Sequence, residues 1–190
     1  MAASARRVGI YGGTFDPIHH GHLILAREAA DLFQLDRVIF VPARMSPHKL
    51  GVPVAPDADR LEMLQAAIAH EPRFAVDALE LKRPPPSFAI DTLEAFARRD
   101  ADAQFFLLIG EDQLKRFGTW HRAEDLRKMA EPIVLRRGDV SGSKTKLSVP
   151  RRIDISATEI RNRVASGASI RYLVPDAVAA IIAARQLYRN

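Results

Sequence analysis

The sequence predicts an α/β protein built on a doubly wound parallel sheet, and three observations support this. Strand-like and helix-like segments alternate along the chain, which is typical of parallel sheets with helical connections. Residues 104–109 form a continuous apolar run, as a strand covered on both faces requires. A glycine turn, Gly12-Gly13, joins the first apolar segment to a helical pattern. We therefore expect a single domain over residues 1–190, with a small C-terminal helical part.

The first half of the chain predicts three strands and two helices. Short apolar runs indicate the strands, and apolar residues three and four positions apart, such as Leu61, Leu64 and Ile68, indicate the helices. The intervening stretch at 43–56 contains too much proline and glycine for regular structure. We expect strands at 8–11, 37–42 and 74–76, and helices at 20–33 and 57–70.

The second half predicts three more strands and three helices. Ser87 is placed to cap a helix at 89–98, and Ser156 to Glu159 has the spacing of a capping box. Gly167 is placed to end the helix that follows Ser156, and Pro175 to open the last helix, through about residue 185. We expect strands at 104–109, 132–135 and 153–155, with a loop at 137–150.

Composition limits the possible classes of function. The chain has 190 residues and no cysteine, which excludes disulfides and thiolate metal sites and fits a reducing compartment. No apolar run reaches the roughly 20 residues of a membrane span, and no signal peptide is recognisable, so we expect a cytoplasmic protein with no membrane partner. The net charge of +5 arises from basic residues interleaved with acidic ones. This favours a small polyanion such as a nucleotide over nucleic acid.

Residues 12–22 carry the strongest functional signal. A strand, a glycine turn and a helix start together make a place where backbone N–H groups point at an anion. His19 and His22 add side-chain donors at the same spot, whereas we expect His20 to point away. A zinc site is the alternative, but Asp16 is the one further ligand nearby, so we expect no protein metal site.

Several common catalytic motifs are absent. The sequence has no Gly-x-Gly-x-x-Gly after its first strand, no Gly-x-x-x-x-Gly-Lys-Ser/Thr loop and no Gly-x-Ser-x-Gly elbow. It therefore offers no evident covalent nucleophile. The chemistry that remains is group transfer by positioning and electrostatics.

The stretch Gly12-Gly13-Thr14-Phe15-Asp16-Pro17-Ile18-His19-His20-Gly21-His22 resembles the signature of the HxGH nucleotidylyltransferases. Within that superfamily the chain resembles the bacterial nicotinate-mononucleotide adenylyltransferases, in motifs that occur in the family's order from about residue 8 onward. These motifs lie at Pro42, 46–49, 60–64, 80–83, 86–88, 91–93, 106–114, Trp120, 136–138 and 155–161.

The resemblance implies a Rossmann-like enzyme of NAD biosynthesis. ATP and nicotinate mononucleotide would give deamido-NAD (nicotinate adenine dinucleotide) and pyrophosphate, with Mg²⁺ bound to the triphosphate. The phosphate of the mononucleotide would itself attack the α-phosphorus, which agrees with the lack of a protein nucleophile. A monomer and a homo-oligomer are both compatible with the sequence.

The resemblance also assigns roles to individual residues. The two backbone N–H groups of the Ser87-Phe88 turn would bind the pyridine carboxylate, and the indole of Trp120 would stack on the nicotinate ring. The catalytic residues would be His19, His22, Lys49 and Arg161. ATP would be bound by Gly12, Gly13, Thr14, Phe15, Gly110, Asp112, Ser156, Thr158 and Arg161, and the mononucleotide by Ser87, Phe88, Trp120 and Arg136.

Simpler explanations exist for four of these residues. Lys49 could be a solvated loop lysine, Ser156 only a helix cap, Arg161 one half of a surface ion pair, and Trp120 a core residue.

The sequence departs from the family's pattern at Ser46, Phe88 and Ala157, where proline, tyrosine and serine are common. None of these changes removes an essential donor. Two alternative functions stay open: another HxGH adenylyltransferase, such as one acting on phosphopantetheine, and a nucleotide-binding regulator without turnover.

Overall fold

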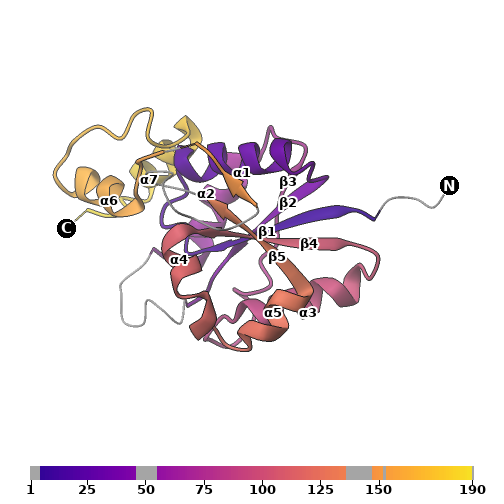
Figure 1. Cartoon of the computed structure of the whole chain (residues 1–190). Coiled ribbons are helices and arrows are strands. Elements are labelled where there is room, and N and C mark those ends of the chain that lie inside the picture. The colour runs from indigo at the N-terminus through magenta and orange to yellow at the C-terminus, as the bar shows by residue number, and fades with distance from the viewer. Residues whose placement is uncertain (1–4, 46–54, 136–146, 152, 190) are drawn as a thin grey trace.

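A parallel sheet with the strand order β3-β2-β1-β4-β5-β6 forms the centre of the computed structural model (Figure 1). The structure describes residues 5–45, 55–135, 147–151 and 153–189. Within these ranges all neighbouring strands run parallel. The strands are β1 (Arg7–Gly13), β2 (Arg37–Pro42), β3 (Phe74–Val76), β4 (Gln104–Gly110), β5 (Ala130–Leu135) and β6 (Ser148–Val149).

Helices cover both faces of this sheet. In Figure 1, α1 and α2 lie on one side of the strands, and α3 and α5 lie on the other. α6 and α7 pack with the first group. The helices are α1 (His20–Leu32), α2 (Asp57–Ile68), α3 (Ala89–Arg99), α4 (Glu111–Lys115), α5 (Ala123–Met129), α6 (Ala157–Ala165) and α7 (Asp176–Ala184), with a 3₁₀ turn η1 (Phe117–Thr119).

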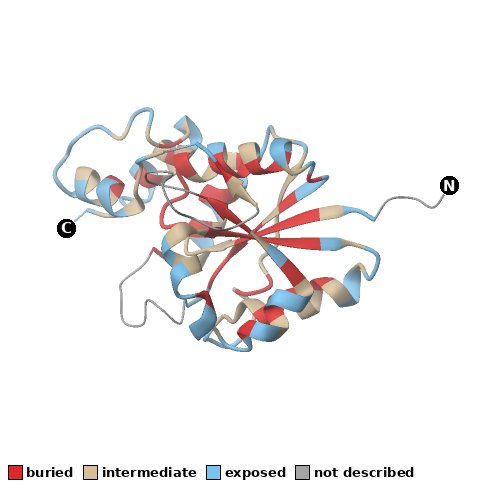
Figure 2. Cartoon of the chain, viewed as in Figure 1, coloured by how far each residue is buried: buried red, intermediate tan, exposed pale blue. Residues whose placement is uncertain are grey.

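The central strand β4 is buried on both faces because its side chains alternate between two hydrophobic clusters. Phe106 and Leu108 join the cluster beneath α1 and α2, whereas Phe105, Leu107 and Ile109 join the cluster beneath α3 and α5. Figure 2 shows the strands as the buried centre and the outer helix surfaces as exposed. The apolar run at 104–109 is thereby confirmed as a strand covered on both sides.

The direction in which successive strands are added to the sheet reverses between β1 and β4. The chain builds β1, β2 and β3 outward on one side, then crosses to the other side of β1 to build β4, β5 and β6. Ligands of such sheets bind outside the carboxyl ends of the strands at this switch point. Gly13 ends β1 and Gly110 ends β4, so the turns that follow them meet there. The predicted doubly wound α/β fold is confirmed.

The end of the sheet differs from the prediction. Residues 153–155 are not a strand, and the last strand is β6, which pairs with Val134 and Leu135 inside the stretch predicted as a loop. The alternation of Ile153, Asp154 and Ile155 has the period of a strand, but both isoleucines pack on the core without joining the ladder. A two-residue strand carries too short a pattern to be recognised.

The two predicted serine caps have different outcomes. The Ser156 hydroxyl accepts a hydrogen bond from the Glu159 N–H at 3.1 Å, so the cap of α6 is confirmed. Ser87 does not cap α3: the helix begins at residue 89 as predicted, but its N-cap is Phe88, and no side chain caps it.

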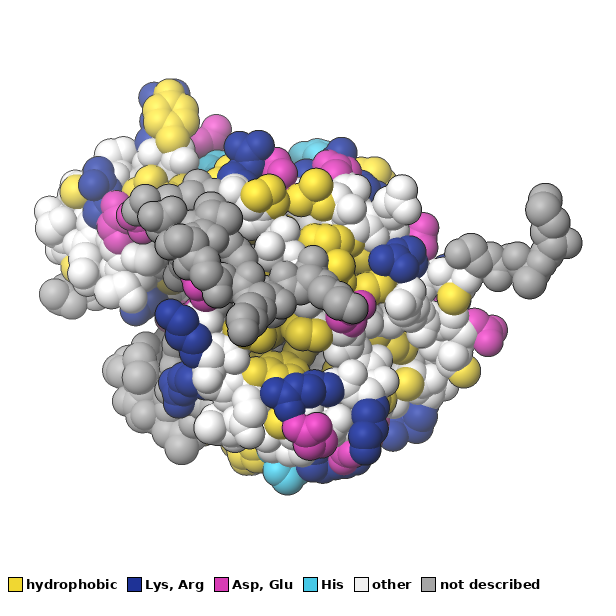
Figure 3. Space-filling model, viewed as in Figure 1, with side chains coloured by type: hydrophobic (Ala, Val, Ile, Leu, Met, Phe, Trp, Pro, Cys, Tyr) yellow, Lys and Arg dark blue, Asp and Glu magenta, His cyan; other side chains and the backbone are white. Residues whose placement is uncertain are grey.

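Two surface properties bear on the possible partners. No helix among the described residues is long and apolar enough to cross a membrane. On the face shown in Figure 3, Lys and Arg side chains are interspersed with Asp and Glu, as the sequence indicated.

Candidate active site

The glycine turn after β1 is held by a buried aromatic residue. Phe15 has a left-handed backbone, with φ of 47°, and its side chain is only 3% exposed. Its ring contacts Tyr11, Phe40 and His22 at centroid distances of 5.2–5.7 Å. A Cβ on Gly13 would lie 3.0 Å from this ring, so a larger residue would require the buried ring to shift. Phe15 therefore shapes the turn from behind, and only its backbone can face a ligand.

His19 and His22 stack at the N-terminus of α1. Their ring centroids are 3.7 Å apart with 27° between the planes, and His19 is 1% exposed. A Cβ on Gly21 would lie 3.0 Å from His19 Nδ1, so this glycine lets the imidazole lie against the helix. The N–H of His20, the first residue of α1, donates to Leu173 O at 2.9 Å, which connects the start of this helix to the segment before α7. The pair thus presents two imidazoles beside the helix N-terminus, as predicted.

The opposite wall is formed after β4 and by the start of α6. The helix α4 begins directly after Gly110, and its second residue, Asp112, is exposed and lines the cavity. Arg161 donates from Nη1 to Asp16 O at 2.8 Å and from Nη2 to Thr158 Oγ1 at 3.3 Å. A backbone oxygen that follows the glycine turn therefore helps to fix the Arg161 guanidinium, which is not held by a surface ion pair alone.

These walls enclose a polar cavity of about 310 Å³. It brings together segments that lie up to about 150 residues apart in the sequence. The predicted residues that line it are Gly12, Gly13, Thr14, Phe15, His19, His22, Ser87, Gly110, Asp112, Ser156, Thr158 and Arg161. Lys49 and Arg136 lie outside the described residues.

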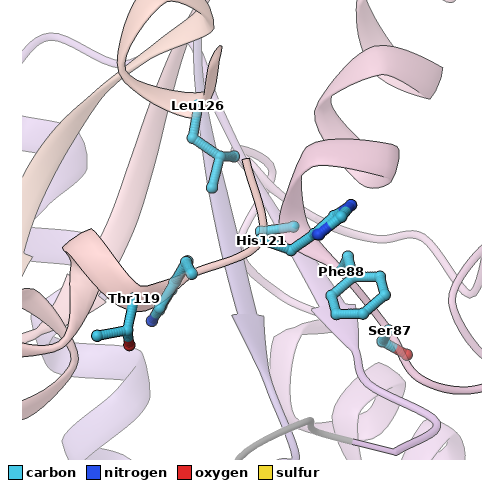
Figure 4. A pocket seen from close by; sticks show the side chains of 7 residues that line it. Ser87, Phe88, Thr119, His121 and Leu126 are labelled. Atoms are coloured by element: carbon cyan, nitrogen blue, oxygen red, sulfur yellow. The ribbon is translucent and has the colours of Figure 1, made fainter. Parts of the chain in front are cut away.

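A second cavity of about 300 Å³ adjoins the first, because Ser87 and Ala89 line both. Its other lining residues are Phe88, Thr119, Trp120, His121 and Leu126. Figure 4 shows the ring of Phe88 beside that of His121, and the ring centroids are 4.5 Å apart. Three of the seven residues that line the second cavity therefore carry aromatic rings, and we call it the aromatic cavity.

Trp120 lies both at the hydrophobic core and at a cavity, the two environments considered for it. Its ring packs on Phe117 at 5.2 Å, as part of the cluster beneath α3 and α5, and the half-buried side chain also lines the second cavity. It is therefore anchored in the core while presenting a surface to a ligand.

Sequence reasoning missed Arg60, whose side chain is fully buried behind the glycine turn. Its guanidinium donates to Thr14 O at 2.7 Å, Ala43 O at 2.8 Å and Ala55 O at 3.1 Å, and to Asp57 Oδ1 at 2.5 Å. It therefore ties together the turn after β1, the end of β2 and the start of α2. One signal was present, because Arg60 shares a helix face with Met63 and Leu64, where an apolar residue is expected.

The carboxylate of Asp16 is engaged within the protein. It is 4% exposed and accepts hydrogen bonds from the Tyr188 hydroxyl at 2.6 Å and from the Ala55 N–H at 3.1 Å. Among the described residues, no group of three or more His, Asp or Glu side chains is placed to hold a metal ion.

Glu80 is a second buried acid, and it lines the polar cavity beside Ser87. Its Oε1 accepts a hydrogen bond from Thr92 Oγ1 at 2.6 Å, and Arg83 Nη2 in turn donates to the same hydroxyl at 2.6 Å. Burial raises the pKa of Glu80, and nearby Asp91 raises it further; the hydrogen bonds from Thr92 and Ser87 and the charge of Arg83 offset part of this rise. Sequence reasoning recognised 80–83 as a motif but gave Glu80 no role.

Comparison with known proteins defines the class first. The sequence profile of a family described as cytidylyltransferase-like matches residues 10–163, from β1 to α6. The chain therefore belongs to a family of nucleotidyltransferases.

Two curated relatives named "Probable nicotinate-nucleotide adenylyltransferase" are similar over nearly their whole length. The protein from Thermomicrobium roseum is 42% identical, over 97% of this chain and 92% of its own. The protein from Thermus thermophilus is 42% identical, over 96% of this chain and 100% of its own. The chain belongs to the nicotinate-nucleotide adenylyltransferase family, and the resemblance read from its motifs is confirmed.

Solved structures agree with the fold. The Plasmodium falciparum nicotinic acid mononucleotide adenylyltransferase, solved in complex with NaAD, has a TM-score of 0.81 at 19% identity, over 96% of this chain and 97% of its own. A Vibrio parahaemolyticus protein described as a nicotinate-nucleotide adenylyltransferase has a TM-score of 0.75 at 18% identity, over 97% of this chain and 96% of its own.

The role of Arg60 can be tested by removing its charge. We expect Arg60→Met to lower the free energy of unfolding by about 3 kcal/mol or more, because buried carbonyls and Asp57 lose their partner. Urea denaturation measures this change. The exposed Arg98→Met is the matched control and should change stability by less than about 0.5 kcal/mol. Equal effects of the two substitutions would refute the structural role of Arg60.

Glu80 makes stability depend on pH. Because its pKa is raised in the folded state, the folded protein binds the proton more tightly than the unfolded chain. This contribution to stability is complete below the unfolded-state pKa and is lost as the pH rises through the folded-state pKa. Glu80→Gln, which keeps the acceptor oxygen, should therefore gain stability relative to the unmodified protein as the pH increases. Denaturation at several pH values tests this, with the exposed Glu131→Gln as control; parallel curves for Glu80→Gln and the unmodified protein would contradict it.

Proposed function

We propose that this protein transfers the adenylyl group of ATP to nicotinate mononucleotide, forming nicotinate adenine dinucleotide and pyrophosphate in NAD biosynthesis. One observation carries the proposal: a polar cavity at the start of α1 joins an aromatic cavity at Ser87 and Ala89. The first suits a triphosphate, and the second suits a flat ring. The names of the curated relatives and the NaAD bound to the Plasmodium protein agree with it.

The polar cavity supplies what two phosphate groups need in order to approach each other. The N-terminus of α1 contributes a partial positive charge, and the backbone of the turn at Gly13 lines the cavity. His19 and His22 can each donate a hydrogen bond whether neutral or charged, and Arg161 adds a full positive charge. Catalysis would then consist of holding the α-phosphate next to the attacking phosphate and neutralising the charge that develops on the leaving pyrophosphate.

The remaining ATP contacts follow from the same cavity. Ser156 and Thr158 would help Arg161 hold the β- and γ-phosphates, and Asp112, at the end of β4, would accept hydrogen bonds from the ribose. Mg²⁺ would be bound mainly by the triphosphate itself and would supply further charge neutralisation. Lys49 would reach the reacting phosphates.

The aromatic cavity would hold the nicotinate ring. Trp120 and Phe88 offer flat surfaces for stacking. The Ser87 N–H donates to Met45 O at 3.1 Å, so of the two backbone donors proposed for the pyridine carboxylate we now assign the Phe88 N–H. Arg136 would contact the mononucleotide. We also propose that residues 1–190 act as one nucleotidylyltransferase domain in the cytoplasm, without nucleic acid as a partner.

Pyrophosphate release tests the reaction and the acceptor together. With ATP and Mg²⁺, we expect release with nicotinate mononucleotide and little with nicotinamide mononucleotide or phosphopantetheine. His22→Ala should lower kcat/KM by about 10²–10³-fold, the usual effect of losing one preorganised donor, with the fold intact by circular dichroism. Preference for another acceptor would refute the substrate, and ATP binding without release would favour a regulator. Near-normal activity of His22→Ala would refute its phosphate contact.

Trp120 can be tested separately from ATP. Trp120→Ala should raise KM for nicotinate mononucleotide by about 3- to 10-fold, the worth of one aromatic stacking contact, with KM for ATP nearly unchanged. Trp120→Phe keeps a ring and should recover most of the loss. If Trp120→Ala lowers stability in urea but leaves KM unchanged, the residue serves only the core.

A further inference from the structure

The residue beneath the phosphate-binding turn that no motif accounts for is Tyr188. It follows α7 in the sequence, and its hydroxyl donates a hydrogen bond to Asp16 Oδ1 at 2.6 Å, across 172 positions of the chain. The ring is half-buried and packs on the cluster beneath α1 and α2. Burial and the Asp16 carboxylate raise the pKa of this phenol, so the hydroxyl stays protonated and remains a donor at neutral pH.

Asp16 links this hydroxyl to the cavity. Its carboxylate is buried and lies 3.9 Å, Oδ2 to Nη1, from the guanidinium of Arg161. The stronger contact of Arg161 is the one to the backbone oxygen of Asp16, at 2.8 Å. A buried carboxylate needs partners, and here two of them are Tyr188 and the Ala55 N–H, each on Oδ1. The carboxylate is thus kept from closing fully on Arg161.

We propose that Tyr188 is a positioning residue for the ATP-phosphate site: it holds the Asp16 carboxylate away from Arg161, so that the guanidinium stays available to the phosphates. The inference rests on the proposed function, because it assigns Arg161 to the ATP phosphates. Without the hydroxyl, Asp16 would turn toward Arg161, whose Nη1 already lies 3.9 Å from Oδ2. The guanidinium is then shared between a carboxylate and the incoming phosphate.

The test removes one oxygen atom. Tyr188→Phe keeps the packed ring and loses the donor, and it should weaken the binding of ATP by about tenfold, the usual effect of losing a hydrogen bond to a charged group. KM for nicotinate mononucleotide should change by less than about twofold, because Tyr188, Asp16 and Arg161 do not line the aromatic cavity proposed for its ring. The matched control is Tyr172→Phe, a tyrosine that is 77% exposed, for which no effect is expected.

A second substitution separates positioning from folding. If the free carboxylate of Asp16 competes for Arg161, then Asp16→Asn in the Tyr188→Phe background removes the competitor and should recover part of the ATP affinity. If Tyr188 only stabilises the fold, the double variant should be no better than the single one. Recovery therefore supports the inference, and its absence overturns it.

ATP binding should be measured by calorimetry with the non-hydrolysable α,β-methylene analogue, alongside kcat and both KM values. If the unmodified protein binds the analogue but releases no pyrophosphate from ATP, the proposed reaction is refuted. The comparison of analogue binding between the unmodified protein and Tyr188→Phe still tests the role of Tyr188. If Tyr188→Phe matches Tyr172→Phe in both assays, or raises both KM values equally together with a lower Tm, the positioning role is refuted.

Discussion

The buried guanidinium of Arg60 is the interaction on which the candidate active site depends. The turn after β1 and the end of β2 leave carbonyl oxygens that face the interior, where an unpaired acceptor costs about 1–3 kcal/mol. Arg60 gathers three such oxygens, from Thr14, Ala43 and Ala55. Because the carbonyls are turned inward toward this charge, the opposite side of the Gly12–Phe15 turn is left to face the cavity. The surface proposed to bind an anion would thus be shaped by a cation that does not itself line the cavity.

Two buried carboxylates, Asp16 and Glu80, affect the charge around the same cavity. A site for polyanions would be weakened by free carboxylates, yet Asp16 and Glu80 both line it. Asp16 is held by Tyr188 and Ala55, and Glu80 by Thr92. In each case, donors from other parts of the chain hydrogen-bond to one oxygen of the carboxylate. The two acids therefore help to fix neighbouring segments in place, and His19, His22 and Arg161 line the same cavity.

The sequence predicted most of what is local and missed what is distant. Residues 104–109 and the Ser156 cap were recognised because a strand or a helix start is written in adjacent residues. β6 was misplaced, since two residues carry no period. The Ser87 cap was wrong because neighbouring turn residues compete for one helix start. His19, His22 and Arg161 were brought into one cavity as expected, but the bond from Tyr188 to Asp16 joins residues 172 apart and leaves no local pattern.

At the turn where the two cavities meet, the packing of buried residues affects the surface proposed to select the acceptor. Ser87 and Ala89 line both cavities, so the turn that separates the phosphate region from the aromatic region is the same turn that we propose for the pyridine carboxylate. This turn is fixed from below by Glu80, through its contacts with Ser87 and Thr92. An ionised Glu80 would repel a carboxylate bound at this turn; its raised pKa favours the neutral form, and the nearby charge of Arg83 opposes the repulsion. Under the proposed function, the choice of acceptor would therefore depend on this buried acid as well as on the groups that contact the ring.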